Sequence, residues 1–310
     1  MPKLIDDLRS KDARVRMPYI VKEGMEEYWA NHLRGLVDML HNPQLPVLVI
    51  DNVAEYFYVG TDQEFWSLEK DFPNLAPPFS QFWCEYRMVR KIHSKECGDV
   101  DMTRQMPQGG RVGQLYTVLD PKDVTAVTVP ENAKWALWAE LFIDYSERGI
   151  TCQGPHGAML LCVDAEGRIT GHPQMQSMSN DEYRDLMRSF ISWLNPALLA
   201  ISFLHCKNVK IVENPIPPKL QKRYGERHQG HRLAGYKTLV IEPLKQILRS
   251  QGKSGEVGLA KAMHICRGHF RDYREGKGLF GKYHQLVWTP AIIRGTKGKE
   301  APPREIEIKI

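Results

Sequence analysis

The chain of 310 residues has no long apolar run. Its longest apolar stretches, Leu45–Ile50 and Pro196–Leu204, are far shorter than the roughly 20 residues that a membrane-spanning helix needs. The N-terminal segment MPKLIDDLRSKDARVR also lacks the apolar core of a secretory signal peptide. We therefore expect a cytoplasmic protein without a membrane partner.

Several motifs of common enzyme classes are missing as well. Walker A, G-x-S-x-G and H-E-x-x-H are absent, so P-loop NTPases, α/β-hydrolases and common zinc peptidases have no motif support. A nuclease that uses Mg²⁺ or Mn²⁺ needs several clustered carboxylates, and the few acidic residues after position 205 show no such arrangement. We expect no cofactor.

Cysteine is sparse, with six residues at positions 84, 97, 152, 162, 206 and 266 and no C-x-x-C pair. This pattern excludes the dense disulfide framework of small secreted domains and indicates buried thiols. His205-Cys206 and His264-x-Cys266 offer zinc-binding side chains, but their spacing matches no finger, ribbon or knuckle. We therefore predict no metal site.

Charge is divided unevenly along the chain. Residues 206–310 hold 22 Lys and Arg against 9 Asp and Glu, a net charge of +13, whereas the first 205 residues hold 20 basic and 28 acidic residues, a net charge of −8. A basic terminal third is typical of a surface that meets phosphate backbones. The alternative is that its lysines only keep the surface soluble.

Apolar periodicity predicts helices in the first two-thirds of the chain. Stripes of apolar residues recur every three or four positions within residues 1–41, 130–148 and 179–205. Asn195-Pro196 is expected to break or kink the last of these helices. Aromatic residues and prolines gather over residues 63–93, either as a core patch under a long loop, which we favour, or as a stacking surface for nucleic acid.

Short strands are expected between these helices. Apolar runs predict strands over residues 45–51, 114–119 and 124–129, and residues 158–170 resemble a hairpin. Asp51, at the end of the first strand, is expected to cap a helix or form a turn rather than act as a base. The polar segment 96–113 is the best candidate for a mobile loop.

The terminal third is expected to be mainly β-structure. Residues 206–213 and 236–241 read as strands, and the proline-rich segment 214–218 reads as a stiff linker. The basic segment Lys219–Arg232 has almost no aliphatic residues, so we predict a loop or an arm that orders on binding. Six basic residues are candidates for nucleic-acid binding: Lys219, Lys222, Arg223, Arg227, Arg232 and Lys282.

Residues 262–273 carry the densest group of chemically active side chains. Gly268 would cost about 1 kcal/mol inside a helix, so a strand is favoured. The strand period of two places Arg267, His269, Arg271 and Tyr273 on one face. Glycines at 278 and 281 let the chain return and bring His284 beside them. The candidate catalytic residues are Arg267, His269, Arg271, Tyr273 and His284.

This pattern, H-x-x-R-G-H-F-R-x-Y followed by G-L-F-G, W-x-P and Arg294-Gly295, resembles an uncharacterised family of phage, prophage and mobile-element proteins. The resemblance covers residues from about 202 to 296 and implies a setting without an activity. Replication, host takeover, defence and counter-defence are all compatible with it.

These observations predict an α+β protein with an acidic helical and mixed region, 1–205, and a basic, mainly antiparallel β region, 206–310. The alternative is that the two regions form one domain. Arginines bind phosphate oxygens, and a histidine transfers protons near neutral pH. We expect a protein that binds RNA or single-stranded DNA, and the same residues would suffice for metal-independent RNA cleavage. The alternatives are an interaction protein that binds a host or defence protein without catalysis, and a polar sheet whose histidines only satisfy backbone carbonyls.

Overall fold

The computed structural model describes residues 3–10, 15–16, 26–60, 71–87, 91–94, 98–101, 110–125, 127–144, 150–152, 158–175, 180–227, 233–241, 264–266, 269–276, 278, 284–289 and 292–294. Helices and strands are both abundant, as the sequence predicts. The helices are α1 (Leu4–Leu8), α2 (Glu26–Leu40), α3 (Asp51–Gly60), η2 (Pro121–Asp123), α5 (Asn180–Leu204) and α6 (Pro218–Arg227). The strands are β1 (Val15–Arg16), β2 (Val47–Val49), β3 (Gln81–Arg87), β4 (Lys91–Ser94), β5 (Gly98–Asp101), β6 (Arg111–Leu119), β7 (Trp135–Asp144), β8 (Ile150–Cys152), β9 (Ala158–Val163), β10 (Gln174–Met175), β11 (Val209–Asn214), β12 (Tyr236–Ile241), β13 (His264–Cys266), β14 (His269–Asp272), β15 (Leu286–Thr289) and β16 (Ile292–Arg294).

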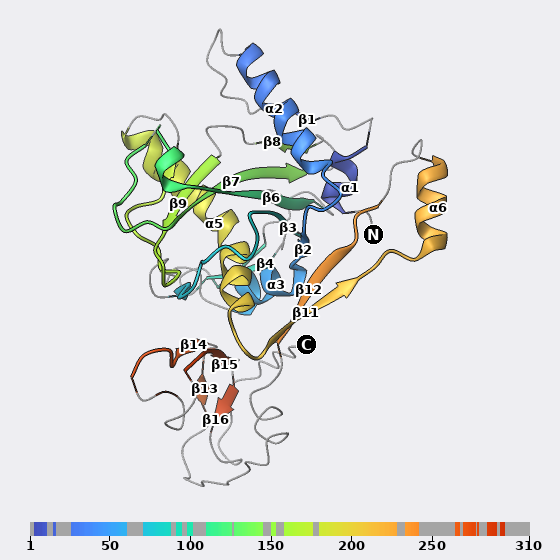
Figure 1. Ribbon diagram of the computed structural model, residues 1–310. Coiled ribbons are helices and arrows are strands. Elements are labelled where there is room, and N and C mark those ends of the chain that lie inside the picture. Colours follow the sequence, from blue (N-terminus) through green and yellow to red (C-terminus); the bar gives the residue numbers. More distant parts are fainter. Residues whose placement is uncertain are drawn as a thin grey trace.

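One large mixed sheet organises the protein (Figure 1). Its strand order is β1-β8-β7-β6-β3-β2-β12-β11, with β9 also pairing with β7 and β10 pairing with β9. Strands β3, β6 and β7 pair antiparallel, whereas β2 pairs parallel with both β3 and β12. The carboxyl ends of β2, β3 and β12 therefore lie at the same end of the sheet.

Helices cover both faces of this sheet, because its central strands are apolar on both sides. Phe82 and Cys84 of β3 belong to the core that contains α3 and α5, whereas Trp83 between them belongs to the core that contains α1 and α2. Gly113 lies on β6 opposite Glu85, and a Cβ added there would stand 2.1 Å from the Trp83 ring. Glycine is thus required at this position for the indole to pack flat against the sheet.

The aromatic cluster over residues 63–93 is a core patch wherever the structure describes it. Phe72, Phe82, Trp83 and Tyr86 are buried, and Phe79 packs at the edge of the same core. These rings are therefore not a stacking surface for nucleic acid. Residues 61–70 lie outside the described part of the chain.

The helix predicted over residues 130–148 is wrong, because residues 135–144 form strand β7. Leu137 and Leu141 pack in the core beside α5, whereas Phe142 packs in the core beside α1 and α2. A strand that is buried on both faces is apolar at nearly every position, so it also contains apolar residues three and four apart. The helical stripe arose from this double burial.

Three further predictions differ from the structure. The segment 96–113, expected to be a mobile loop, contains strand β5 at Gly98–Asp101 and the start of β6 at Arg111. No strand forms at the described positions within 124–129, where valines pack instead against a small core of Ala136, Leu160 and Cys162. Helix α5 is unbroken at Pro196. Proline removes one backbone hydrogen bond from a helix, but Leu194 and Leu198 beside it are fully buried, and this packing keeps the helix continuous.

The predicted basic loop is helical up to Arg227, as α6. Pro218 occupies the first position of this helix, where a missing N–H costs nothing. Leu220 is 48% exposed, and the half-buried side of α6 is formed by Gln221, Tyr224 and Gly225, so the sequence offers no apolar stripe that would reveal the helix. In Figure 1, α6 stands apart from the sheet at the far end of β11. Residues 228–232, including Arg232, lie outside the described residues.

The basic part of the chain shares the large sheet with the acidic part. Strand β12 pairs with β2, and β11 pairs antiparallel with β12 at the outer edge. The expected division near residue 206 therefore falls between α5 and an edge strand of the same sheet. Among the described residues, no helix is both long and apolar enough to cross a membrane.

The strand predicted over residues 262–273 consists of two described pieces, β13 and β14. Strand β13 pairs antiparallel with β16, and β14 pairs antiparallel with β15. His264 pairs with Arg294 and His269 with Thr289, five residues further along both strands, so the two described pairs have the same hairpin register. The expected hairpin forms, while Arg267 and Gly268 lie outside the described residues.

Candidate functional site

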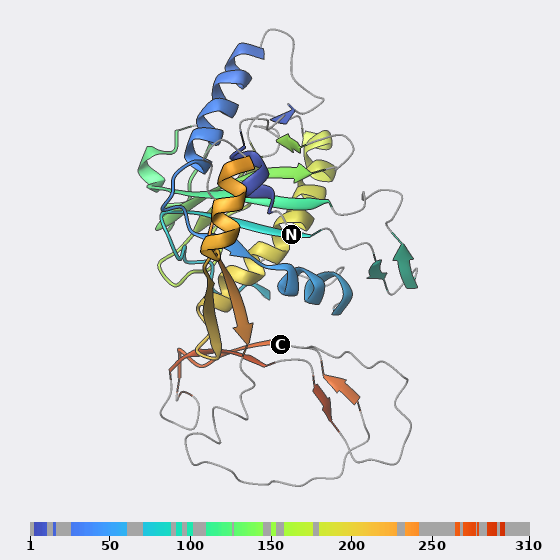
Figure 2. The same cartoon turned by 90° about the vertical axis from the view of Figure 1, so that its right-hand side faces the viewer.

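The β14–β15 hairpin lies beside the carboxyl end of β12, below the large sheet in Figure 2. Asn208, just before β11, donates from Nδ2 to the Trp288 carbonyl at 2.9 Å and accepts from the Trp288 N–H at 3.0 Å. The Lys207 N–H donates to the Leu286 carbonyl at 3.2 Å. These hydrogen bonds to the backbone of β15 attach it to the segment that joins α5 to β11.

One face of the hairpin is aromatic and buried. The Trp288 ring centroid lies 4.7 Å from that of Phe270, 4.8 Å from that of Phe203 in α5, and 5.6 Å from that of Tyr56 in α3. All three contacts are edge-to-face, the geometry that aromatic quadrupoles favour. Hydrophobic packing therefore fixes the hairpin on the two helices that cover this side of the sheet.

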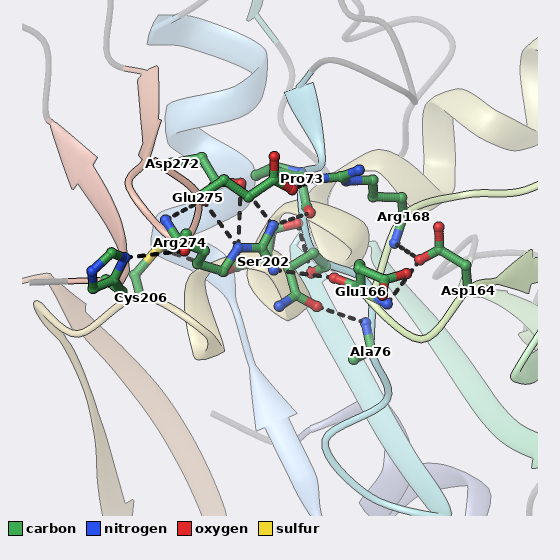
Figure 3. Close-up of polar contacts among 12 residues, drawn as sticks. Pro73, Ala76, Asp164, Glu166, Arg168, Ser202, Cys206, Asp272, Arg274 and Glu275 are labelled. Atoms are coloured by element: carbon green, nitrogen blue, oxygen red, sulfur yellow. Dashed lines mark hydrogen bonds and ion pairs between the residues drawn. The ribbon is translucent and has the colours of Figure 1, made fainter. Parts of the chain in front are cut away.

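Arg274 adds a polar clamp at the turn end of the hairpin (Figure 3). Its guanidinium donates to the Asp272 carboxylate, to the Glu166 carbonyl at 3.1 Å and to the Pro73 carbonyl at 3.2 Å. The hydrogen bond from Arg274 lowers the pKa of Asp272. Arg168 in the turn after β9 pairs with Glu275 at 2.6 Å. Three segments distant in sequence are thus joined around one arginine.

The opposite face of the hairpin presents the predicted polar residues. Arg271 Nε donates to His269 Nε2 at 3.2 Å, and an Arg271 terminal nitrogen lies 3.5 Å from the Tyr273 hydroxyl. His269 is exposed, and Arg271 and Tyr273 are half-buried. Three of the five candidate catalytic residues are therefore neighbours, as their shared parity predicts.

His284 lies at the other end of the ladder. Tyr273 N–H donates to the Gln285 carbonyl, and His284 Nδ1 lies 3.2 Å from the Arg274 carbonyl. Because His269 pairs with Thr289, about five residues separate the two histidines along the strands, or roughly 16 Å. The structure does not bring His284 to His269. Arg267 and Lys282 lie outside the described residues.

The basic helix α6 is a separate surface. Lys219, Lys222 and Arg223 are exposed, and Arg227 is the last residue of the helix. Strand β11 begins beside the hairpin and ends just before α6, and its six residues span roughly 20 Å. The candidate phosphate-binding residues therefore form two groups at opposite ends of the β11–β12 ribbon.

The His205-Cys206 pair is structural. His205 Nε2 lies 2.8 Å from the Ala76 carbonyl, and burial lowers the pKa of its imidazole. Burial raises the pKa of the Cys206 thiol to about 12, so the thiolate that zinc needs is disfavoured. Within the described residues, no group of three or more His, Cys, Asp or Glu is placed to hold a metal ion.

A group of charges at the carboxyl end of β3 and the start of β6 has no counterpart among the predicted sites. Arg111 lies 3.0 Å from a Glu85 oxygen and 3.3 Å from Asp51, while the other Glu85 oxygen accepts from Trp83 Nε1 and from the Ile5 N–H. Burial raises the pKa of Glu85. Burial and then the neighbouring Asp144 raise the pKa of Asp7 to about 6, although its side chain reaches solvent. In the sequence, this group is marked only by charged residues within otherwise apolar strands.

The segment between β14 and β15 contains a glycine motif. Residues 276–281 spell G-x-G-x-x-G, the string of the dinucleotide-binding loop. That loop must follow a strand and open a helix within a βαβ unit. Here the segment lies between two antiparallel strands, β14 and β15, and Gly276 and Gly278 adopt positive φ angles of 75° and 71°. Gly276 and Gly278 therefore belong to the connection between two antiparallel strands, which is not the context of a dinucleotide-binding loop.

The site is thus a firmly packed hairpin with an imidazole, a guanidinium and a phenol on the face opposite Trp288, where their strand partners Val287 and Thr289 are buried. A guanidinium suits phosphate oxygens, and phenol and imidazole rings suit stacking with bases or proton transfer. No protein-family model matches the chain, and searches of curated proteins and of solved structures find no match either.

Proposed function

We propose that the protein binds nucleic acid, single-stranded RNA in particular, in the cytoplasm of a cell that carries a mobile element. The observation that carries the proposal is the contact of Arg271 with both His269 and Tyr273 on the hairpin face opposite Trp288. Single-stranded RNA is recognised by aromatic rings that stack on bases and by arginines that bind phosphate. The three side chains provide both kinds of contact.

The second group of basic residues extends the proposed interface. Lys219, Lys222 and Arg223 of α6 stand at the other end of the β11–β12 ribbon, exposed to solvent. A strand of RNA that lies along this ribbon would meet the hairpin first and α6 roughly 20 Å later. The ribbon would then set the spacing between two phosphate contacts.

Metal-independent RNA cleavage is a second candidate function. It is favoured by the 3.2 Å contact between His269 Nε2 and Arg271 Nε. When a phosphate draws the guanidinium away, His269 Nε2 would take the proton of the 2′-hydroxyl, whose oxygen attacks phosphorus. The bond from phosphorus to the 5′-oxygen breaks, and this oxygen leaves with a proton from solvent water. Arg271 would stabilise the charge that develops on the phosphate oxygens.

A protein-binding role is the alternative. The specific observation for it is the exposed apolar group on β11 and α6, where Ile211, Val212 and Leu220 are 46%, 41% and 48% exposed. Exposed apolar residues on an edge strand are typical of a site that pairs with another chain. The partner in that case would be a host or defence protein, and no catalysis would be needed.

A salt series tests the proposed function. If Arg271, Lys219, Lys222 and Arg223 each neutralise one phosphate, affinity for single-stranded RNA should fall roughly 50-fold between about 50 and 200 mM salt. Fluorescence anisotropy with labelled RNA and DNA of the same sequence measures this. Absence of binding at the lower salt concentration contradicts the proposal, and a stoichiometric protein partner captured under that condition would favour the protein-binding role.

A further inference from the structure

A groove runs along α2, which lies at the top of the molecule in Figure 1, whereas the β14–β15 hairpin lies at the bottom. One side of the groove is formed by residues of α2 and its end that recur every three or four positions and so share one helix face: Ala30, Leu33, Arg34, Val37, Asp38 and His41. The end of α1 and strand β1 form the other side. The cavity has a volume of about 610 Å³, within the range of small-ligand sites, about 300–1,000 Å³.

The inner wall of this groove is aliphatic. Leu8 of α1 is fully buried, and Leu33, Val37 and Val15 are half-buried beside it. No Phe, Tyr or Trp is among the described residues that line the groove, so it offers no stacking surface to a nucleobase or another flat ring. Such a wall suits a saturated chain, whose burial stabilises a complex through the hydrophobic effect.

A positive charge lines the groove at the end where α2 stops. Arg9 is half-buried, and its Nε and Nη2 donate to the carbonyls of Leu40 and Asn42. These bonds use two of the five N–H groups of the guanidinium, and the other three have no partner within the described residues. Burial lowers the pKa of Arg9 and the charge of Asp6 raises it, but the Asp6 carboxylate pairs with Lys3. Arg9 is thus held in a fixed orientation with donors left for an anion.

The other ionisable side chains of the groove change this balance little. His41 Nδ1 lies 2.8 Å from the Val37 carbonyl, and His41 Nε2 lies 3.1 Å from the Arg9 carbonyl, so backbone groups occupy the imidazole. Arg34 and Asp38 are exposed at the rim, one helical turn apart, where their opposite charges offset each other. Arg9 is therefore the group in this groove that is best placed to bind a negative charge.

We infer that this groove binds a single saturated chain with a carboxylate head, that is, a fatty acid. The carboxylate would accept from Arg9, and the chain would lie along Val37, Leu33 and Ala30. Ala30 and His41 are eleven positions apart, or roughly 16 Å along a helix. Carbon–carbon single bonds are about 1.5 Å long, so an extended chain of about twelve carbons covers a similar distance. The inference is independent of RNA binding, because none of the described residues that line the groove belongs to the hairpin or to α6.

Isothermal titration of the full chain with dodecanoate, decanoate and octanoate, each below its micelle concentration, tests the inference. Affinity should fall roughly fourfold for each methylene group removed, because that group no longer contacts the aliphatic wall. Dodecyltrimethylammonium has the same chain and the opposite charge, and it should bind at least about tenfold more weakly than dodecanoate. Equal affinity for these two probes, or no binding of dodecanoate, overturns the inference.

Two substitutions locate the site. Ala30→Phe places a ring in the groove and should weaken dodecanoate binding by at least about tenfold, because the end of the chain loses its place on the wall. Ala165→Phe is the matched control, since Ala165 is exposed in the turn after β9, and it should bind like the parent. Arg9→Gln removes the charge but keeps an amide donor, and it should lose the preference for dodecanoate over dodecyltrimethylammonium. Dodecanoate binding that is unchanged in a folded Ala30→Phe or Arg9→Gln variant contradicts the groove as the site.

Discussion

Replacing His269 with alanine is expected to slow RNA cleavage by about two to four orders of magnitude, the usual scale for loss of a general acid or base. The imidazole lies at the exposed end of β14, 3.2 Å from Arg271, and does not belong to the packed side of the hairpin. The fold should therefore survive the substitution. The readouts are cleavage of a labelled RNA in the presence of EDTA and detection of a cyclic phosphate end.

His172→Ala is the matched control for this experiment. His172 is also exposed, but it lies in the turn between β9 and β10. Its loss should leave the rate unchanged. If His269→Ala cleaves as fast as the parent, or if the parent itself cleaves nothing without metal, His269 is not catalytic and only the phosphate-binding role of Arg271 remains.

The hairpin was predictable because a strand has a fixed side-chain period. Parity alone placed His269, Arg271 and Tyr273 on one face, and the glycines after Tyr273 indicated the return of the chain. The position of His284 was not predictable, because the register of a hairpin depends on its turn. One ladder assigns His269 to Thr289, and this carries His284 to the opposite end.

The large sheet shows where sequence patterns fail. The sequence of strand β7 resembles that of a helix because both of its faces are buried. Helix α6 was not predicted because its half-buried side, Gln221, Tyr224 and Gly225, contains no aliphatic residue. Apolar periodicity reveals the difference between a buried apolar face and an exposed polar face. The secondary structure of an element without that difference cannot be assigned from its sequence pattern. The buried contact of Glu85 with Arg111 was missed for a different reason: it joins neighbouring strands whose pairing no local pattern reveals.

Replacing Trp288 with alanine should destabilise the protein by about 3–5 kcal/mol, the range for removing a buried tryptophan. The indole is 2% exposed and touches the rings of Phe270, Phe203 and Tyr56. Its removal leaves a cavity between the hairpin and helices α3 and α5. Denaturant unfolding measures the loss, and amide hydrogen exchange should show faster opening of residues 269–273 than of β6 or β7.

Leu220→Ala provides the comparison for Trp288→Ala. Leu220 is exposed on α6, so its truncation should change the stability by less than about 0.5 kcal/mol. The two variants together separate loss of packing from a general sensitivity to apolar truncation. If Trp288→Ala were as stable as the parent, the position of the hairpin would not depend on its aromatic face. The aromatic packing would then not be the cause of a rigid binding surface.

The measurement that most directly tests the central claim is the affinity of Arg271→Met for single-stranded RNA at low salt. Methionine keeps the length and apolar stem of the side chain but removes the guanidinium between His269 and Tyr273. Arg34→Met is the matched control, because Arg34 is exposed on α2, at the opposite end of the molecule in Figures 1 and 2. Both variants lose one positive charge. We predict that Arg271→Met binds about tenfold more weakly and Arg34→Met binds like the parent; equal affinities for the two variants would contradict a binding site on the hairpin.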